Sequence, residues 1–346
     1  MTTEATFSAP PADAYEQMSR LVTGHWIPQV IRAAIGLGVP EHLADAALTA
    51  GELADRAGSA PGTTFRLLRA CVAIGLVTAD DDGRFRGTPL LRTLHRDTPG
   101  SLRGLALATT LPGQWLAWNA FTASVRKGET QVAQALGTDF FSYLEEHPDE
   151  ARDFSRGLAS TTALWTSAAA QVIDTAGVGL AVDVGGSDGA LLHLLLEANP
   201  DLRGIVFDRP NVVPDAIEAA EKRGLADRTE VIGGDFFAGV PAADLYLVKM
   251  IMHDWDDDGC VTILRNIRTA MNPGARVAVV EMLVGNPSDP GPAALMDMNM
   301  LAVVPGQERS LAEYDALLSA AGLRRTTVTS TGSGQSVIES VAALTP

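Results

Sequence analysis

The chain has 346 residues, of which 46% are hydrophobic and 20% charged, and this composition excludes a largely disordered protein. Its length predicts about two domains, because a single hydrophobic core rarely grows beyond about 250–300 residues. The formal net charge of −16 argues against a nucleic acid as the main partner, since a strongly acidic surface repels phosphate groups.

The sequence also bears on compartment and metal content. It has no uninterrupted apolar run of about 18 residues, so we expect no membrane span. Its first residues lack the basic start and the apolar centre of a signal peptide. Cys71 and Cys260 agree with a reducing compartment and do not have metal-site spacing. We therefore expect a cytoplasmic protein without a bound metal, since no His/Asp/Glu cluster with ligand spacing is evident.

Residues 1–100 are expected to form a mainly helical domain with one hairpin. Thr49 is a candidate N-cap for a short helix, with Glu52 in the position of a capping box. A second helix follows the turn at 58–62, and its apolar residues recur at helical spacing: Phe65, Leu68, Val72 and Leu76. Two short strands around an Asp-Gly turn at 82–83 then complete a winged-helix pattern.

A winged helix serves either DNA binding or the packing of subunits. Arg66 and Arg69 on the second helix favour DNA. The acidic residues at 80–82 would place negative charge at the hairpin tip, facing phosphates, and so disfavour it. We expect a packing or dimerisation domain.

A helical linker is expected at 101–177, followed by an α/β domain at 178–346. Apolar strand-like runs are expected at Leu180–Val184, Gly204–Asp208, Thr229–Ile232, Asp244–Lys249 and Arg276–Glu281. Amphipathic helices are expected between them at 190–198, 213–223 and 258–271. Such nearly continuous apolar strands between helices predict a Rossmann-like parallel sheet that is covered on both faces.

The ends of these strands carry glycines or polar side chains. Ligands of open α/β sheets bind beyond the carboxyl ends of the strands, so these residues are the first candidates for a site. In strand order they are Gly185, Gly186 and Gly189; Asp208; Asp235 and Phe236; Lys249, shortly before His253; and Glu281.

The glycine loop favours a cofactor with an amino-acid tail. Its glycines let backbone approach a ligand, and the helix that follows points its N-terminus at it. The pattern departs from the dinucleotide pattern because Ser187 replaces the second glycine, and Asp188 would repel a pyrophosphate. A nicotinamide-dependent oxidoreductase is the disfavoured alternative. Asp208 suits ribose hydroxyls.

These residues resemble the S-adenosylmethionine-dependent small-molecule O-methyltransferases of the caffeic acid and isoflavone type, and their bacterial relatives that modify phenazines and antibiotics. The resemblance covers nearly the whole chain and is carried by five runs: 182–186, 207–210, 234–237, 247–255 and 306–310. It implies a class I methyltransferase domain and an N-terminal winged-helix-like domain that builds a homodimer.

The resemblance also implies a cofactor site for S-adenosyl-L-methionine. The glycine loop would line the methionine part, Asp208 would hold the ribose, and Asp235 with Phe236 would contact adenine, beside Lys249. The complete set of expected cofactor contacts is Asp183, Gly185, Gly186, Asp208, Arg209, Gly234, Asp235, Phe236 and Lys249.

His253 is the expected general base, flanked by Glu281 and Glu308. A phenol has a pKa near ~10, and a histidine is the side chain best matched to accept its proton near neutral pH. A carboxylate bound to the other ring nitrogen would fix the tautomer, and Asp254 is a further candidate for that role. The remaining histidines are expected to be structural or surface residues: His25, His42, His95, His147 and His193.

The expected acceptor is a small aromatic molecule with a hydroxyl group. The resemblance places the region around 154–158 and that around 296–300 near it, and the candidate pocket residues are Phe154, Leu158, Trp165, Met252, Trp255, Met296 and Met300. Two departures from the family pattern, Ser187 and the run 305–307, leave the loop geometry and the substrate shape open. A decarboxylase or hydroxylase within the family, or a non-catalytic ligand-binding regulator, are the alternatives.

Overall fold

The computed structural model describes residues 12–343, apart from the side chains of residues 12, 155–156 and 158–164. The chain forms two compact units, each built from two segments. The first comprises Met1–Pro112 and Pro148–Thr161, and the second Gly113–His147 and Thr162–Pro346. The division passes through the expected linker, and the three-part division with boundaries near 100 and 177 stays a prediction.

The first unit has the predicted winged-helix pattern. Its small sheet has the order β1-β3-β2, with antiparallel pairing throughout. Its elements are α1 (Ala12–Thr23), α2 (Trp26–Gly36), α3 (Val39–His42), β1 (Leu48–Thr49), α4 (Ala50–Ala57), α5 (Pro61–Ala73), β2 (Val77–Ala79), β3 (Arg84–Gly87), α6 (Pro89–Arg92), α7 (Arg103–Ala108) and the first part of α12 (Pro148–Ala170).

Local signals in this unit are partly confirmed. Thr49 and Glu52 form the predicted capping box, in which each side chain satisfies a backbone N–H group of the other's residue. The predicted helix at α5 is present, but two of the apolar residues that indicated it are exposed: Phe65 to 45% and Val72 to 38%. The buried stripe instead runs through Thr64, Leu68 and Cys71, one helical position away.

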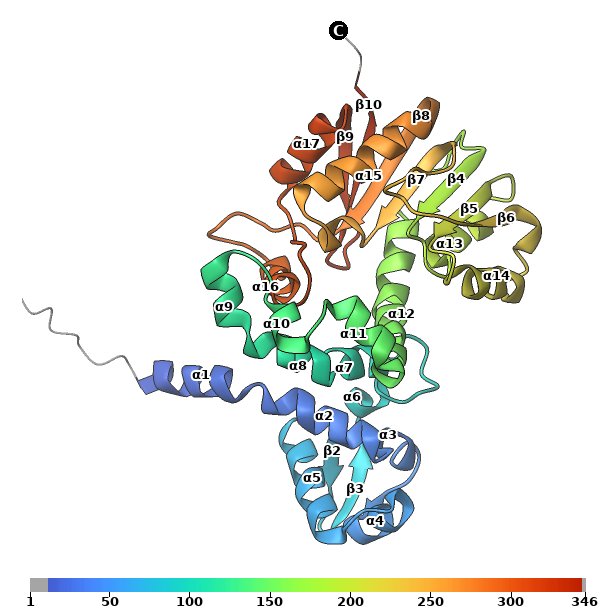
Figure 1. The fold of residues 1–346 in the computed structure, drawn as a ribbon. Coiled ribbons are helices and arrows are strands. Elements are labelled where there is room, and N and C mark those ends of the chain that lie inside the picture. Colours follow the sequence, from blue (N-terminus) through green and yellow to red (C-terminus); the bar gives the residue numbers. More distant parts are fainter. Residues whose placement is uncertain (1–11, 344–346) are drawn as a thin grey trace, which may run out of the picture. The chain divides into compact units, whose positions relative to one another are not determined.

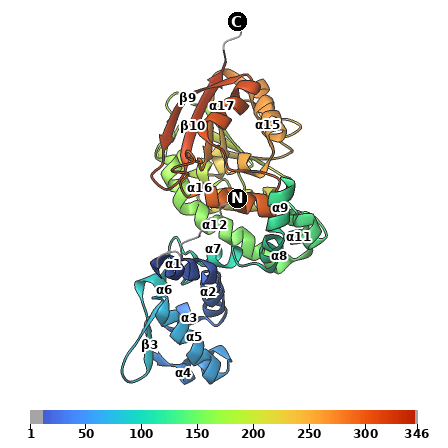
Figure 2. The same cartoon turned by 90° about the vertical axis from the view of Figure 1, so that its left-hand side faces the viewer.

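The second unit contains the predicted parallel sheet. Seven strands stand in the order β6-β5-β4-β7-β8-β10-β9, and β4 to β8 run parallel. β10 is antiparallel to both neighbours and lies beside β9 at the edge of the sheet (Figure 2). The strands are β4 (Leu180–Val184), β5 (Arg203–Asp208), β6 (Thr229–Gly233), β7 (Ala243–Lys249), β8 (Met271–Glu281), β9 (Leu323–Ser330) and β10 (Ser336–Ala342).

Helices cover both faces of this sheet (Figure 1). Tyr246 and Val248 of β7 face the core formed with α15 and α17. Leu245 and Leu247 alternate with them and face the core formed with α13, α14 and the end of α12. The helices are α8 (Pro112–Asn119), α9 (Phe121–Lys127), α10 (Val132–Leu136), α11 (Phe140–Glu146), α13 (Ala190–Ala198), α14 (Val213–Lys222), α15 (Asp257–Ala270), α16 (Ala293–Val303) and α17 (Leu311–Ala320), with short 3-10 turns η1 (Ala226–Arg228) and η2 (Met252–Asp254).

This strand order fixes where a ligand can bind. β4 has β5 on one side and β7 on the other, so the chain reverses its direction of travel across the sheet there. The crevice beyond the carboxyl ends of β4, β5 and β7 is therefore the expected binding site. Within residues 12–343, no helix is both long and apolar enough to cross a bilayer.

Candidate active site

The loop after β4 turns sharply by means of left-handed backbone. Gly185 has φ +68°, Ser187 +54° and Gly189 +75°. The positive φ disfavours any side chain at Gly185, and a Cβ atom there would also lie 2.6 Å from Cδ1 of Ile251. Ser187 thus adopts the left-handed conformation in which glycine is favoured. The replacement of the usual glycine by Ser187 therefore leaves the shape of the loop intact.

Asp208 ties this loop to the end of β5. Its Oδ2 accepts a hydrogen bond from the backbone N–H of Ser187 at 2.8 Å, and its Oδ1 accepts one from Arg209 N–H at 2.7 Å. The side chain is half-buried, and each carboxylate oxygen keeps a lone pair beyond these two hydrogen bonds. Arg209 itself is exposed.

Asp183 is buried beneath the loop, where the charge of the half-buried Lys249 acts on it. Asp183 is 2% exposed, and the N–H of Leu192 in the first turn of α13 donates to it. Burial raises the pKa of Asp183 to about 7, although Lys249 opposes the rise. Burial also lowers the pKa of Lys249, against the attraction of Asp183 and Glu281. Asp183 therefore supports the loop from below, and a direct cofactor contact stays a prediction.

An aromatic cluster follows β6. Gly234 N–H donates to Asp208 O at 2.9 Å, which places the next residues beside β5. The Phe236 ring lies 6.0 Å from Trp255, and Phe237 meets Trp255 edge-on at 4.7 Å. Asp235 is exposed and Phe236 is half-buried. Trp255, a predicted substrate contact, therefore packs against the predicted adenine side of the site.

The turn after β7 carries His253. Met250 has a left-handed φ of +56°, and the chain then enters η2. Glu281, at the end of β8, fixes this turn: its Oε1 accepts the N–H groups of Ile251 at 3.0 Å and Met252 at 2.9 Å. The left-handed residue and the two hydrogen bonds together set the direction of the His253 side chain.

His253 lies among three carboxylates. Its Nδ1 is 2.9 Å from Glu308 Oε1 and 3.4 Å from Glu281 Oε2. Its Nε2 is 3.6 Å from Asp254 Oδ1, so the adjacent residue also faces the ring. His253 is 6%, Glu281 0% and Glu308 4% exposed. The structure brings together the three residues that the sequence assigned to catalysis.

The electrostatics of this cluster favour a protonated imidazole. Burial alone would lower the pKa of His253, but the charge of Glu281 and the hydrogen bond to Glu308 outweigh it and raise the pKa to about 10. Burial raises the pKa of Glu281 to about 7, while His253 opposes this. Because the groups interact strongly, the cluster titrates as a unit. Within the cluster, the imidazole of His253 holds its proton tightly.

The sequence-based reason for expecting no metal needs correction. One nitrogen and two carboxylate oxygens of His253, Glu281 and Glu308 lie within 4.8 Å of one another, which is ligand spacing at the rim of the sheet. Pairing of one imidazole with two carboxylates accounts for this arrangement. Spacing along the sequence does not show this cluster, because its members stand on three separate segments; only the family resemblance placed the two glutamates beside His253. That the protein holds no metal stays a prediction.

Two further residues organise the cluster, and sequence reasoning assigned neither of them a role. Asp297 of α16 accepts the backbone N–H of Glu308 through Oδ1 at 3.0 Å. Arg309 is fully buried and donates to backbone carbonyls of the His253 turn. Arg309 stood inside the run 306–310 that carried the resemblance, so its position was visible, whereas nothing marked Asp297.

The predicted pocket residues differ in their burial and in the elements that carry them. Met252 is 0% exposed and belongs to the core between the sheet and α15, and its substrate contact stays a prediction. Met296 and Met300 stand on α16, the helix that holds Glu308 through Asp297. Trp165 is half-buried in the second unit, and Phe154 is in the first; their substrate contacts stay predictions. The side chain of Leu158 lies outside the described residues.

Comparison with known proteins agrees with this geometry. Residues 118–324 match the O-methyltransferase domain, and 19–97 match the O-methyltransferase dimerisation domain. The chain is 39% identical over 330 residues to a mitomycin biosynthesis 6-O-methyltransferase of Streptomyces lavendulae, covering 93% of each chain.

Solved structures give the same result. The mitomycin 7-O-methyltransferase MmcR has a TM-score of 0.89 at 37% identity, covering 96% of this chain and 98% of its own. An O-methyltransferase from neocarzinostatin biosynthesis, solved with S-adenosylmethionine and 2-hydroxy-5-methyl naphthoic acid, has a TM-score of 0.79 at 33% identity, covering 91% and 96%.

The sheet order and the loop after β4 define a class I methyltransferase fold, joined to an N-terminal helical dimerisation domain. The matched domains and the identity over nearly the full length go further: the chain belongs to the S-adenosylmethionine-dependent O-methyltransferase family. It is an enzyme whose cofactor is S-adenosyl-L-methionine.

Proposed function

We propose that this enzyme methylates a hydroxyl group of a small aromatic natural product, with His253 as the general base. The observation that carries the proposal is the contact between His253 Nδ1 and Glu308 Oε1 at 2.9 Å. An ionised carboxylate can only accept, so this contact keeps a proton on Nδ1 and leaves Nε2 as the nitrogen that accepts one.

The residues at the sheet rim fit the cofactor. Bare backbone at Gly185 suits a closely approaching amino-acid tail, and the half-exposed Asp208 offers carboxylate lone pairs to ribose hydroxyls. The half-buried Phe236 ring suits a base that packs against its face. Gly185, Asp208 and Phe236 would hold these three parts. When bound, S-adenosylmethionine supplies an electrophilic methyl group on a sulfonium.

The chain's own contribution is the removal of the acceptor's proton. As the new oxygen–carbon bond forms and the sulfur–carbon bond breaks, the hydroxyl proton passes to His253 Nε2. Glu308 and Glu281 then stabilise the imidazolium, because both carboxylates face Nδ1. The raised pKa of His253 makes proton acceptance favourable. The ring must be neutral before the acceptor reacts, because a protonated Nε2 cannot accept a second proton.

Two lines of support point to an aromatic acceptor. The relative from neocarzinostatin biosynthesis was solved with a hydroxynaphthoic acid. In this chain, α16 brings Met296 and Met300 to the segment that carries Glu308, and flexible thioethers suit a flat apolar ring.

The test begins with calorimetric titration of the purified protein with S-adenosylmethionine and, in parallel, with NAD. We expect binding of the first at micromolar strength and none of the second. Incubation with a panel of phenols should then give products heavier by one methyl group, identified by mass spectrometry. Products that have lost carbon dioxide or gained a hydroxyl would instead support the decarboxylase or hydroxylase alternative, and no product would favour a ligand-binding role.

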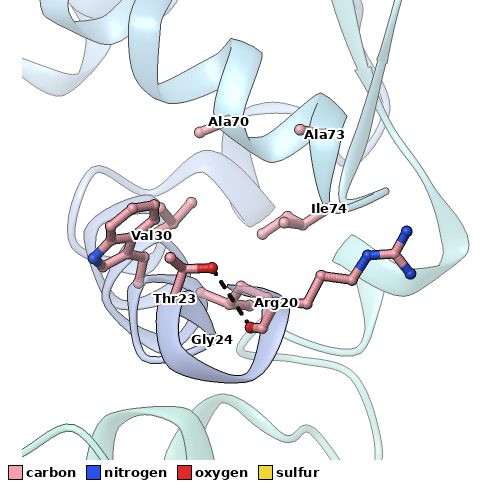
Figure 3. Close-up of a pocket in the computed structure, with 9 residues that line it drawn as sticks. Arg20, Thr23, Gly24, Val30, Ala70, Ala73 and Ile74 are labelled. Atoms are coloured by element: carbon pink, nitrogen blue, oxygen red, sulfur yellow. Dashed lines mark hydrogen bonds between the residues drawn. The ribbon is translucent and has the colours of Figure 1, made fainter. Parts of the chain in front are cut away.

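A homodimer is part of the same proposal. The dimerisation domain match covers residues 19–97, which include the last part of α1 and all of α2. These two helices carry exposed apolar side chains: Tyr15, Met18, Leu21, Val22, Trp26 and Ile27. Beside them, Val30, Ala70 and Ile74 help to line an apolar pocket (Figure 3). A surface of this kind fits a second copy of the chain. Light scattering should give a dimer, and replacing Leu21 with Glu should shift it toward monomer; a wild-type monomer at micromolar concentration would contradict the homodimer.

A further inference from the structure

The residue after Glu308 is a buried cation that the proposed chemistry does not use. The Arg309 side chain is 0% exposed, whereas its ionic partner Asp257 is 67% exposed. A guanidinium buried to this extent is costly unless hydrogen bonds satisfy its donors. The acceptors of its hydrogen bonds therefore show which part of the chain Arg309 fixes.

The donors of Arg309 meet the two ends of the His253 turn. Nη1 donates to Met252 O at 2.9 Å, and Nη2 donates to Trp255 O at 2.8 Å. Nε donates to Asp257 Oδ1 at 3.0 Å, at the start of α15. The planar guanidinium fork thus bridges the carbonyls before and after His253 and Asp254.

The turn is held by opposite charges on its two sides. The carboxylate of Glu281 accepts the N–H groups of Ile251 and Met252, and Arg309 donates to the carbonyl of Met252. Two successive peptide groups therefore point their N–H ends to an anion, and the next one points its carbonyl oxygen to a cation. This arrangement removes the freedom of the turn to rotate.

The segment before Arg309 packs onto the same turn. A Cβ atom on Gly306 would collide with His253 O and would come 2.5 Å from the carbonyl carbon of Asp254. Gly306 therefore contacts the backbone of the turn, Glu308 contacts the imidazole, and Arg309 contacts the carbonyls on either side of it. This explains why the unusual run 305–307 still carries a glycine at its centre.

We propose that Arg309 is a positioning residue for the reaction: it fixes the His253 turn so that Nε2 keeps its direction toward the acceptor. The inference rests on the proposed role of His253 as the base. Glu308 and Arg309 are neighbours, so one segment holds both the ring and the backbone that carries it. A lysine would keep the charge but could not bridge two carbonyls in the same plane.

The test compares Arg309→Lys, His253→Ala and the double variant, with Arg276→Lys as the matched control. Arg276 also donates to a backbone carbonyl, that of Asp174, but lies away from the His253 turn. For each purified variant, S-adenosylmethionine affinity is measured by calorimetry, and kcat and KM are measured with a phenol that the wild type methylates.

We expect Arg309→Lys to lower kcat by about 10- to 100-fold, because a small displacement of the base removes its alignment. Cofactor affinity should stay within about twofold, since the hydrogen bonds of Arg309 go to Met252, Trp255, Asp257 and Gln307 and none goes to Gly185, Asp208 or Phe236. In the His253→Ala background, the same change should have less than about a twofold effect on the residual rate. Arg276→Lys should leave kcat unchanged.

Two results would overturn the inference: a wild-type kcat in Arg309→Lys, or an equal loss of kcat with and without His253, which would mean a general structural role. Wild-type kcat in His253→Ala would instead refute the proposed base. Where Arg309→Lys fails to fold, Gly306→Ala replaces it, because the added methyl group pushes on the same turn. A wild-type kcat in Gly306→Ala would count against the inference equally.

Discussion

The loop after β4 and the turn after β7 lie at the same edge of one sheet but are built in contrasting ways. The loop uses bare glycine backbone and a half-exposed carboxylate, Asp208. The turn is buried, and its side chains carry charges of both signs: His253, Glu281 and Arg309. The loop is thus accessible to a ligand, while the charged side chains of the turn are largely shielded from water.

This difference indicates a division of labour. Half-exposed acceptors and open backbone can be satisfied by an arriving ligand, which suits binding. Buried charges interact strongly because little water screens them, which suits the control of a proton. Substitutions in the loop should therefore change cofactor affinity but not kcat, and substitutions at the turn should change kcat but not cofactor affinity.

The largest expected effect comes from the turn. His253→Ala should lower kcat by roughly 10²–10⁴-fold, because no other group accepts the hydroxyl proton as directly. S-adenosylmethionine affinity, measured by calorimetry, should remain close to that of the wild type. A variant that binds the cofactor tenfold more weakly at unchanged kcat would reverse the assignment of the two regions.

The matching change in the loop is Asp208→Ala. Removal of the carboxylate frees the N–H groups of Ser187 and Arg209 and removes the acceptor that we propose for the ribose. We expect the dissociation constant for S-adenosylmethionine to rise by about 10- to 100-fold, the equivalent of about 1–3 kcal/mol. At saturating cofactor, kcat should recover; a lasting loss of kcat would show that the loop also takes part in the chemistry.

Glu308→Gln sharpens the comparison within the turn. Glutamine can still accept the Nδ1–H hydrogen bond but no longer supplies the negative charge that raises the pKa of His253. The acidic limb of the kcat/KM profile should therefore move to lower pH, and kcat should fall by about tenfold because the imidazolium loses a counter-charge. A limb that moves to higher pH would contradict the assigned charge of Glu308.

The smallest effect is expected from Ser187→Gly. Glycine adopts the left-handed φ of +54° without cost, but it also gains freedom in the unfolded chain, so the two effects of about 1 kcal/mol nearly cancel. Melting temperature and cofactor affinity should change little. A gain of more than about tenfold in affinity would show that the serine distorts the loop.

The sequence predicted the parts of the site that depend on local pattern. Apolar strand runs with polar ends located Gly185, Asp208 and Lys249, because strand direction alone brings these ends to one edge. The capping box at Thr49 and the alternation of strands and helices follow from signals of the same kind. The order of the strands and the antiparallel pair β9 and β10 were not predicted.

The remaining features depend on contacts between distant segments. The meeting of His253 with Glu308 joins residues 55 positions apart, and no spacing rule predicts it; only the family resemblance suggested it. The roles of Asp297 and Arg309 arise from packing around the turn. The burial of Met252 was not visible in the sequence for the same reason, since a methionine beside a candidate base can point either into a pocket or into the core, and here it joins the core.

The most direct test of the account is the pH dependence of kcat/KM for methyl transfer to a phenol by the wild-type enzyme. Carboxylates that raise the pKa of His253 above its ordinary value of 6.5 hold the ring protonated at low pH, and the active base appears only as pH rises through the raised pKa. We predict a rate that climbs with pH along a limb whose apparent pKa lies above 6.5, and that this limb is missing from the residual activity of His253→Ala. A profile that is flat in the wild type, or a limb that persists without the histidine, would contradict the account.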